Sequence, residues 1–219
     1  MDQTHFVSGL LQLPPQATAC YVMAHGAGAG MTHSFMSAVA DDLCQRRVAT
    51  LRYQFPYMEQ GSKRPDRPAV AHATVRAAVG AAAQLVRGLT LFAGGKSFGG
   101  RMTSQAQAEV PLPGVRGLIF LGFPLHPANK PSDERALHLS GIRIPMLFLQ
   151  GTRDALADKE LLTTAVARLG DIATLIPIEG ADHSFHVPAR SGRTDAQVRA
   201  EALDALVAWM ESQKDDPGR

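Results

Sequence analysis

The sequence is short of several features that would mark a specialised class of protein. Its 219 residues include only two cysteines, Cys20 and Cys44, which are too few for a disulfide scaffold and suit free thiols. The 22 basic and 20 acidic residues leave a net charge of +2, without the basic stripe that nucleic-acid binding requires. The sequence contains no His-x-x-x-His or Cys-x-x-Cys pair of the kind that ligates a metal. We therefore expect no metal and no nucleic-acid partner.

Long apolar segments are scarce as well. No uninterrupted apolar run approaches the ~20 residues of a membrane-spanning helix. The first residues, Met1 to His5, do not begin the basic-then-apolar pattern of a secretory signal. We expect a cytoplasmic protein with no membrane partner, and the sequence leaves its oligomeric state open.

Short apolar runs alternate with longer segments of helical period, a pattern that predicts an α/β fold with a mostly parallel central sheet and helices on both faces. The runs are rich in Val, Ile, Leu and Phe, as strands covered on both faces are. The predicted strands are Ala19–Ala24, Val48–Tyr53, Thr90–Ala93, Val115–Leu121, Met146–Gln150 and Ala173–Ile178, with an earlier one near Phe6–Leu13. The predicted helices are Ser34–Arg47, Ala69–Leu89, Gly100–Glu109, Lys159–Leu169 and Thr194–Glu211.

The same pattern predicts one domain over residues 1–213, followed by a flexible C-terminal tail at 214–219. Two stretches, Gln60–Pro68 and Pro124–Ser132, have the composition of surface loops. About 24 residues separate the strand ending at Leu121 from the one starting at Met146. Because this connection is short, we expect no sizeable lid.

The most informative stretch of the chain surrounds Ser97. Gly95-Lys96-Ser97-Phe98-Gly99 has the form G-x-S-x-G, with an apolar run before it and a helix-compatible segment after it. A serine hydroxyl becomes a nucleophile only when it is exposed, held by strained backbone and close to a base. A sharp strand–turn–helix corner provides that geometry, and glycines on either side allow strand and helix to approach.

An acid and a histidine follow Ser97, each just after a predicted strand. Asp154 lies 57 residues beyond Ser97, and His183 lies a further 29 residues on. Because open α/β sheets place their sites at the carboxyl ends of the strands, we expect the three side chains to meet. His183 would take the proton of Ser97, and Asp154 would orient the imidazole. Three rivals stand nearby: Asp158 suits a helix N-cap, Asp182 adjoins the histidine, and His186 is an alternative base.

The chemistry also needs donors for an oxyanion. The glycine-rich stretch His25-Gly26-Ala27-Gly28 follows the first parallel strand, and we expect the amides of Ala27 and Phe98 to supply the donors. A substrate pocket would then involve four residues, with His25 also able to shape the turn: His25, Gly28, Phe123 and His126. Four residues at or after the end of the next strand have two equal interpretations, either bordering the site or lying elsewhere. They are Arg52, Tyr53, Phe55 and Tyr57.

Taken together, these motifs resemble the α/β-hydrolase superfamily over nearly the whole chain. The compact length resembles its small, lidless dienelactone-hydrolase and carboxylesterase-like branch, although dienelactone hydrolases proper carry cysteine where this chain has Ser97. The resemblance implies a serine hydrolase that cleaves an ester or thioester of a small acyl substrate through an acyl-enzyme, without a cofactor. Ser97, His183 and Asp154 would form its triad.

Of the functions from other classes, a binding or scaffolding role remains the alternative, while two nucleotide-binding motifs are incomplete. A catalytically inactive protein of the same fold would bind or scaffold, since fold does not dictate function. Gly95-Lys96-Ser97 is similar to the end of a P-loop, but Thr90 stands where that motif needs a glycine. A dinucleotide fingerprint at Gly26-x-Gly28 would need its third glycine at Met31.

Overall fold

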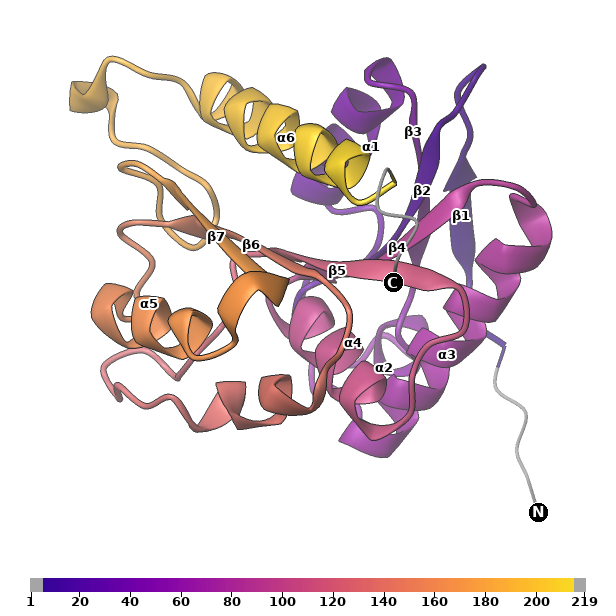
Figure 1. Cartoon of the computed structure of the whole chain (residues 1–219), viewed down its shortest axis with the longest axis horizontal. Coiled ribbons are helices and arrows are strands. Elements are labelled where there is room, and N and C mark those ends of the chain that lie inside the picture. The colour runs from indigo at the N-terminus through magenta and orange to yellow at the C-terminus, as the bar shows by residue number, and fades with distance from the viewer. Residues whose placement is uncertain (1–5, 215–219) are drawn as a thin grey trace.

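A computed structural model of the chain describes residues 6–214. Seven strands form a single sheet in the order β1-β3-β2-β4-β5-β6-β7 (Figure 1). Only β1 runs antiparallel to its neighbour β3, and the remaining pairs are parallel. The strands are β1 (Gly9–Gln12), β2 (Ala19–Ala24), β3 (Val48–Tyr53), β4 (Thr90–Lys96), β5 (Val115–Leu121), β6 (Met146–Gly151) and β7 (Ala173–Ile178).

All six strands predicted for the parallel sheet are confirmed, and β4 and β6 continue slightly further than expected, to Lys96 and Gly151. The early strand is confirmed as the short β1. Strand β7 lies at the edge of the sheet and contains Pro177, which has no amide to donate to a second neighbour.

The five predicted helices are also present. Thr194 and Gln197 form the complete capping box that begins α6. Helix α3 ends at Leu85 rather than Leu89, because Val86 leaves helical geometry (φ −121°) and Gly88 turns the chain at φ 88°. The helices are α1 (Ser34–Gln45), α2 (Pro56–Glu59), α3 (Pro68–Leu85), α4 (Phe98–Glu109), α5 (Lys159–Ala167) and α6 (Asp195–Ser212), with 3₁₀ helices η1 (Glu134–Gly141), η2 (Gly170–Ile172) and η3 (Ala189–Ser191).

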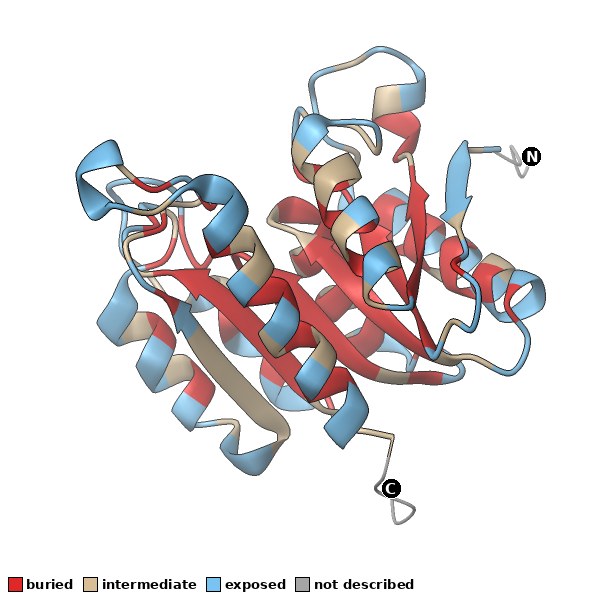
Figure 2. Cartoon of the chain, turned by 90° about the horizontal axis from the view of Figure 1, so that it is seen from above, coloured by how far each residue is buried: buried red, intermediate tan, exposed pale blue. Residues whose placement is uncertain are grey.

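Helices cover both faces of the sheet, as predicted. Helices α1 and α6 pack on one face, and α3, α4 and α5 pack on the other (Figure 1). Each face has its own cluster of buried apolar side chains, and the central strands are buried throughout (Figure 2). Such two-sided burial explains why these strands read as continuous apolar runs in the sequence.

The connections define the surface on which a site can form. Within the described residues, the β5–β6 connection contains the short helix η1, which packs on α4, and no inserted lid domain. None of the helices in residues 6–214 is both long and apolar enough to cross a membrane. Apart from Lys214, the predicted tail at 214–219 lies outside the described residues.

Candidate active site

Ser97 is the single residue between β4 and α4. Strand β4 ends at Lys96 and helix α4 begins at Phe98, so the chain reverses direction at the serine. Its backbone has φ 49° and ψ −114°, a conformation that L residues rarely adopt. Strain of this kind persists only where the surroundings enforce it, and here it places the serine side chain on the turn between strand and helix.

Two flanking glycines allow this sharp turn to pack against β2. A Cβ atom on Gly95 would lie 2.1 Å from the carbonyl oxygen of Ala24, and one on Gly99 would lie 2.5 Å from that of His25. Real Cβ contacts are never this short. The glycines of the G-x-S-x-G frame are therefore required by backbone contact with the neighbouring strand.

The hydroxyl of Ser97 lies within hydrogen-bond distance of a histidine. Its Oγ is 2.8 Å from Nε2 of His183, which lies on the loop after β7. The other ring nitrogen of His183, Nδ1, is 2.6 Å from Oδ2 of Asp154. Since a carboxylate only accepts, Nδ1 carries the proton, and the free lone pair of Nε2 accepts from the serine.

The carboxylate of Asp154 is held by donors on several sides. Its side chain is fully buried, and its Oδ1 accepts a hydrogen bond of 2.8 Å from the amide of Leu156. Its Oδ2 accepts from His183 and also from the side-chain amide of Gln150, at 2.5 Å. These contacts fix the orientation of the acid and, through it, that of the imidazole.

Gln150 was not singled out in the sequence. It is the penultimate residue of β6, and its Oε1 accepts a hydrogen bond of 2.8 Å from the amide of Phe123 at the end of β5. Gln150 thus ties Asp154 to the neighbouring strand. A polar residue ending an otherwise apolar run was the only signal available in the sequence.

The loop that carries His183 is tied down at several points. Asp182 accepts hydrogen bonds from the amides of Ser184 and His186, which closes the turn. The ammonium of Lys96 donates to the carbonyl oxygen of His183 at 2.6 Å. Burial lowers the pKa of Lys96 to about 8, an effect opposed in part by the charges of Asp154 and Asp182.

The three rival residues occupy other positions. Asp158 caps α5 by accepting from the amide of Leu161 at 2.9 Å. His186 is exposed and lies 2.9 Å from Oδ2 of Asp195. The carboxylate of Asp182 is occupied by its own loop. None of these side chains has a hydrogen bond to Ser97 or His183 within the described structure.

The two amides expected to bind an oxyanion have no acceptor within residues 6–214. Neither the amide of Ala27, on the loop after β2, nor that of Phe98, at the start of α4, donates a hydrogen bond to another described residue. Both residues line a cavity that also contains Ser97. Free amides at a helix N-terminus are typical binding groups for an anion.

Two cavities adjoin Ser97, one toward each face of the sheet. The first, of about 360 Å³, is lined on the α1 side by Phe35 and Met36 and includes Lys96 and His183. The second, of about 400 Å³, is lined on the α4 side by Met102 and Arg101. Ala27, Ser97 and Leu156 border both cavities. The serine therefore lies where a substrate could extend in two directions.

The residues expected to form the substrate pocket differ from those that line these cavities. His25, Phe123 and His126 are almost fully buried, and neither they nor Gly28 lines either cavity. His25 lies 2.8 Å from the carbonyl oxygen of Gly26 through Nδ1 and accepts from the amide of Phe55 through Nε2, which shapes the turn instead. His126 likewise accepts from the amide of Asp158.

Four residues at the end of β3 and just after it contact the loop that follows β2 or lie in the core. The hydroxyl of Tyr57 accepts from the amide of Gly28 at 3.3 Å, and Arg52 donates to the carbonyl oxygen of Met31. Tyr53 and Phe55 are buried in the core. None of the four lines the two cavities beside Ser97.

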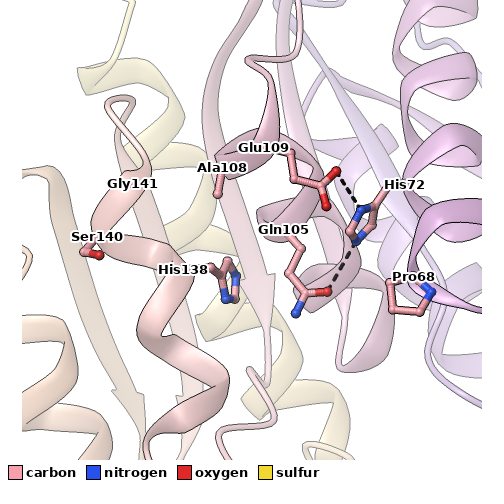
Figure 3. Close-up of a pocket in the computed structure, with 8 residues that line it drawn as sticks. All are labelled: Pro68, His72, Gln105, Ala108, Glu109, His138, Ser140 and Gly141. Atoms are coloured by element: carbon pink, nitrogen blue, oxygen red, sulfur yellow. Dashed lines mark hydrogen bonds and ion pairs between the residues drawn. The ribbon is translucent and has the colours of Figure 1, made fainter.

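A cavity of about 580 Å³ lies away from Ser97, between α3, α4 and η1 (Figure 3). His72 there lies 3.0 Å from Glu109 and 3.3 Å from Gln105, so both ring nitrogens have partners. Among the described residues that line it, the hydroxyl of Ser140 donates to the carbonyl oxygen of Leu137. Ser104, whose hydroxyl lies 2.7 Å from Nε2 of His138, is fully buried and does not line the cavity. The cavities beside Ser97 are therefore the better candidates for the site.

Comparison with known proteins agrees with this fold. The model of a family described as "Alpha/beta hydrolase domain" matches residues 17–211. A serine hydrolase homologue from Coxiella burnetii is similar in structure, with a TM-score of 0.73 and 18% identity over 94% of this chain and 98% of that chain.

Two further structures show the same fold. A serine hydrolase without a lid from Xanthomonas campestris gives a TM-score of 0.71 at 18% identity, over 93% of this chain and 89% of its own. A dienelactone hydrolase from Anabaena variabilis gives 0.68 at 21% identity, over 91% of each chain. The resemblance inferred from the motifs is thereby confirmed, and the chain belongs to the α/β-hydrolase family.

Proposed function

We propose that this protein is a serine hydrolase that cleaves an ester or thioester of a small acyl substrate through an acyl-enzyme. The observation that carries the proposal is the continuous line of hydrogen bonds from Ser97 through His183 to Asp154. A serine, an imidazole and a buried carboxylate in this order form the arrangement that activates a hydroxyl for acyl transfer.

The first step is attack of the Ser97 hydroxyl on the substrate carbonyl. As the new C–O bond forms, the hydroxyl proton passes to Nε2 of His183, and the imidazolium is stabilised by Asp154. The proton then passes from His183 to the departing alcohol or thiol, which leaves Ser97 acylated. Water then attacks the acyl carbon while His183 takes one of its protons. The bond from the acyl carbon to Ser97 breaks, His183 returns the proton to Oγ of Ser97, and the acid is released.

The negative charge on the carbonyl oxygen needs donors during both steps. The amides of Ala27 and Phe98 are assigned to this role, because both border the cavity at Ser97 and neither has an acceptor among residues 6–214. The N-terminus of α4, which begins at Phe98, adds a favourable partial positive charge. Each such donor contributes about 3–4 kcal/mol to the stability of the transition state.

Small substrates fit the surroundings of Ser97. The two adjoining cavities measure about 360 and 400 Å³, and no lid domain is inserted in the described chain to cover a long acyl group. We therefore expect short acyl chains to be cleaved faster than long ones.

A series of 4-nitrophenyl esters from acetate to decanoate tests the proposal. We expect kcat/KM to be greatest for the short esters and turnover to be abolished in Ser97→Ala. Ser191→Ala is the matched control. It removes an exposed hydroxyl that lines neither cavity beside Ser97, and it should retain turnover. Highest activity on decanoate would contradict the size preference. Absence of turnover in the folded wild-type protein would favour a binding role.

A further inference from the structure

The cavity on the α4 side of Ser97 contains two arginines without counter-ions. Arg101 lies in the first turn of α4, and Arg135 lies in η1, which packs on the same helix. Neither guanidinium forms an ion pair or a side-chain hydrogen bond with any residue in the described part of the chain. Most other buried or half-buried charged side chains among residues 6–214 do have partners, as Arg76, Asp154 and Arg199 do.

The position of Arg101 makes this lack of partners costly. Its Nε is buried and has no hydrogen-bond partner, and its guanidinium carbon lies 6.0 Å from the ring centroid of Phe98. Burial lowers the pKa of Arg101, and the neighbouring charge of Arg135 lowers it further. Two like charges are therefore held close together in a partly desolvated place, where an unpaired donor is unfavourable.

The cavity supplies only one opposite charge. Asp66 is the single acidic residue among those that line it, and its Oδ2 already accepts a hydrogen bond of 3.1 Å from the amide of Tyr57. With two arginines and one aspartate, the residues that line this cavity carry a net positive charge. The N-terminus of α4 contributes in the same direction.

We propose that this cavity binds an anionic group of the substrate, a carboxylate or a phosphate, between Arg101 and Arg135. The planar guanidinium matches both oxyanions with paired donors, which a lysine cannot do. Because Ser97 and Phe98 border the same cavity, the anion would belong to the molecule whose ester is cleaved. The inference deepens the proposed function and rests on it: the substrate is an acidic ester or thioester.

Matched ester pairs test this directly. With the anion on the leaving group, 4-acetoxybenzoate and 4-acetoxyphenyl phosphate are compared with neutral 4-acetoxybenzamide. With the anion on the acyl group, the 4-nitrophenyl monoester of glutaric acid is compared with 4-nitrophenyl valerate, after correction for uncatalysed hydrolysis. We expect kcat/KM for the anionic member to exceed that of its neutral partner by about tenfold or more in at least one pair. The benzoate and phosphate arms distinguish the two anions.

Substitutions assign the preference to the arginines. Arg101→Gln and Arg135→Gln should each bring the ratio of anionic to neutral kcat/KM close to one, and added salt should reduce it in the wild type. Because the two arginines lie on different elements, one variant remains informative if the other folds poorly. Arg87→Gln removes an exposed charge elsewhere on the surface and should keep the ratio.

The outcomes separate this inference from the proposed function. If the neutral esters are hydrolysed by Ser97 and no pair shows the anionic preference, the inference is overturned and the proposed function stands. A preference that persists in either arginine variant also overturns it. If no ester of any kind is hydrolysed by the folded wild type, the proposed function fails and the inference fails with it.

Discussion

The side-chain nitrogen of Gln150 lies 2.5 Å from Oδ2 of Asp154, the same oxygen that His183 contacts at 2.6 Å. The other end of Gln150 accepts from the amide of Phe123. A strand residue thus holds the acid of the candidate triad in place and anchors it to the next strand.

Replacing Gln150 by methionine should therefore slow catalysis. Methionine keeps the volume of the side chain but removes both hydrogen bonds, so Asp154 and His183 lose part of their orientation. We expect kcat on a short ester to fall by about 10- to 100-fold with little change in KM. The buried amide of Phe123 would lose its acceptor, at a cost of about 1–3 kcal/mol in the free energy of unfolding. An unchanged kcat in the folded variant would contradict the positioning role.

The choice of acid is tested by a pair of isosteric variants. Asp154→Asn should lower kcat by about 10³- to 10⁴-fold, because an amide cannot hold the imidazole in the required tautomer as a carboxylate does. Asp158→Asn is the control, since asparagine also caps a helix well, and it should leave kcat within a few-fold of the wild type. The reverse pattern in steady-state kinetics would show that the acid has been assigned wrongly.

The turn at the serine tolerates no side chain at Gly99. Gly99→Ala would place a Cβ 2.5 Å from the carbonyl oxygen of His25, so β2 and α4 would have to separate. We expect a clear loss in the free energy of unfolding, of about 2 kcal/mol or more, together with loss of activity.

Gly80 offers the matched control. It is exposed in the middle of α3, and nothing lies within 4 Å of a Cβ added there. Gly80→Ala should therefore raise the free energy of unfolding by about 1 kcal/mol, because alanine is the better helix former. Chemical denaturation measures both variants. Equal effects at the two positions would refute the close packing at the serine turn.

His138 should make stability depend on pH. Burial, with the charges of Arg101 and His72, lowers its pKa from 6.5 to about 4, and its Nε2 lies 2.7 Å from the hydroxyl of Ser104. Between these values the unfolded chain binds a proton that the folded chain does not. The contribution of His138 to the free energy of unfolding is therefore fully present above pH 6.5, and it is lost as the pH falls toward 4. The loss amounts to about 3 kcal/mol at most, less what solvent screens.

Comparison of wild type with His138→Gln by urea denaturation at pH 7.5 and 4.5 isolates this contribution. The difference in the free energy of unfolding between the wild type and His138→Gln should become smaller at the lower pH. His186 provides a control of opposite sign, since its hydrogen bond with Asp195 raises its pKa. Its contribution is present below pH 6.5 and is lost as the pH rises through the higher folded value. A wild-type advantage at His138 that grows on acidification would contradict the account.

Local sequence patterns predicted much of the fold. Buried parallel strands are continuous apolar runs, so six strands could be placed from the sequence, and the carboxyl-edge rule brought Ser97, Asp154 and His183 to one side of the sheet. The short helix α2 and the 3₁₀ helix η1 were missed, because segments this short carry too little periodicity to be recognised.

The residues around the triad were harder to predict. His25, Phe123 and His126 follow strands at the correct edge, but proximity to a strand end does not reveal which way a side chain points, and these three are buried. Arg101 and Arg135 line one cavity although 34 positions separate them in the chain. No local motif connects such residues, so only the packing of η1 on α4 brings them together.

The central claim is that His183 activates Ser97, and covalent labelling tests it without a choice of substrate. The protein is incubated with a fluorophosphonate, and the adduct is located by intact mass and peptide mapping. The account predicts a single adduct on Ser97 that forms in the wild type and in His186→Ala but not in His183→Ala. No adduct on the folded wild-type protein, or equal labelling in His183→Ala, would contradict it.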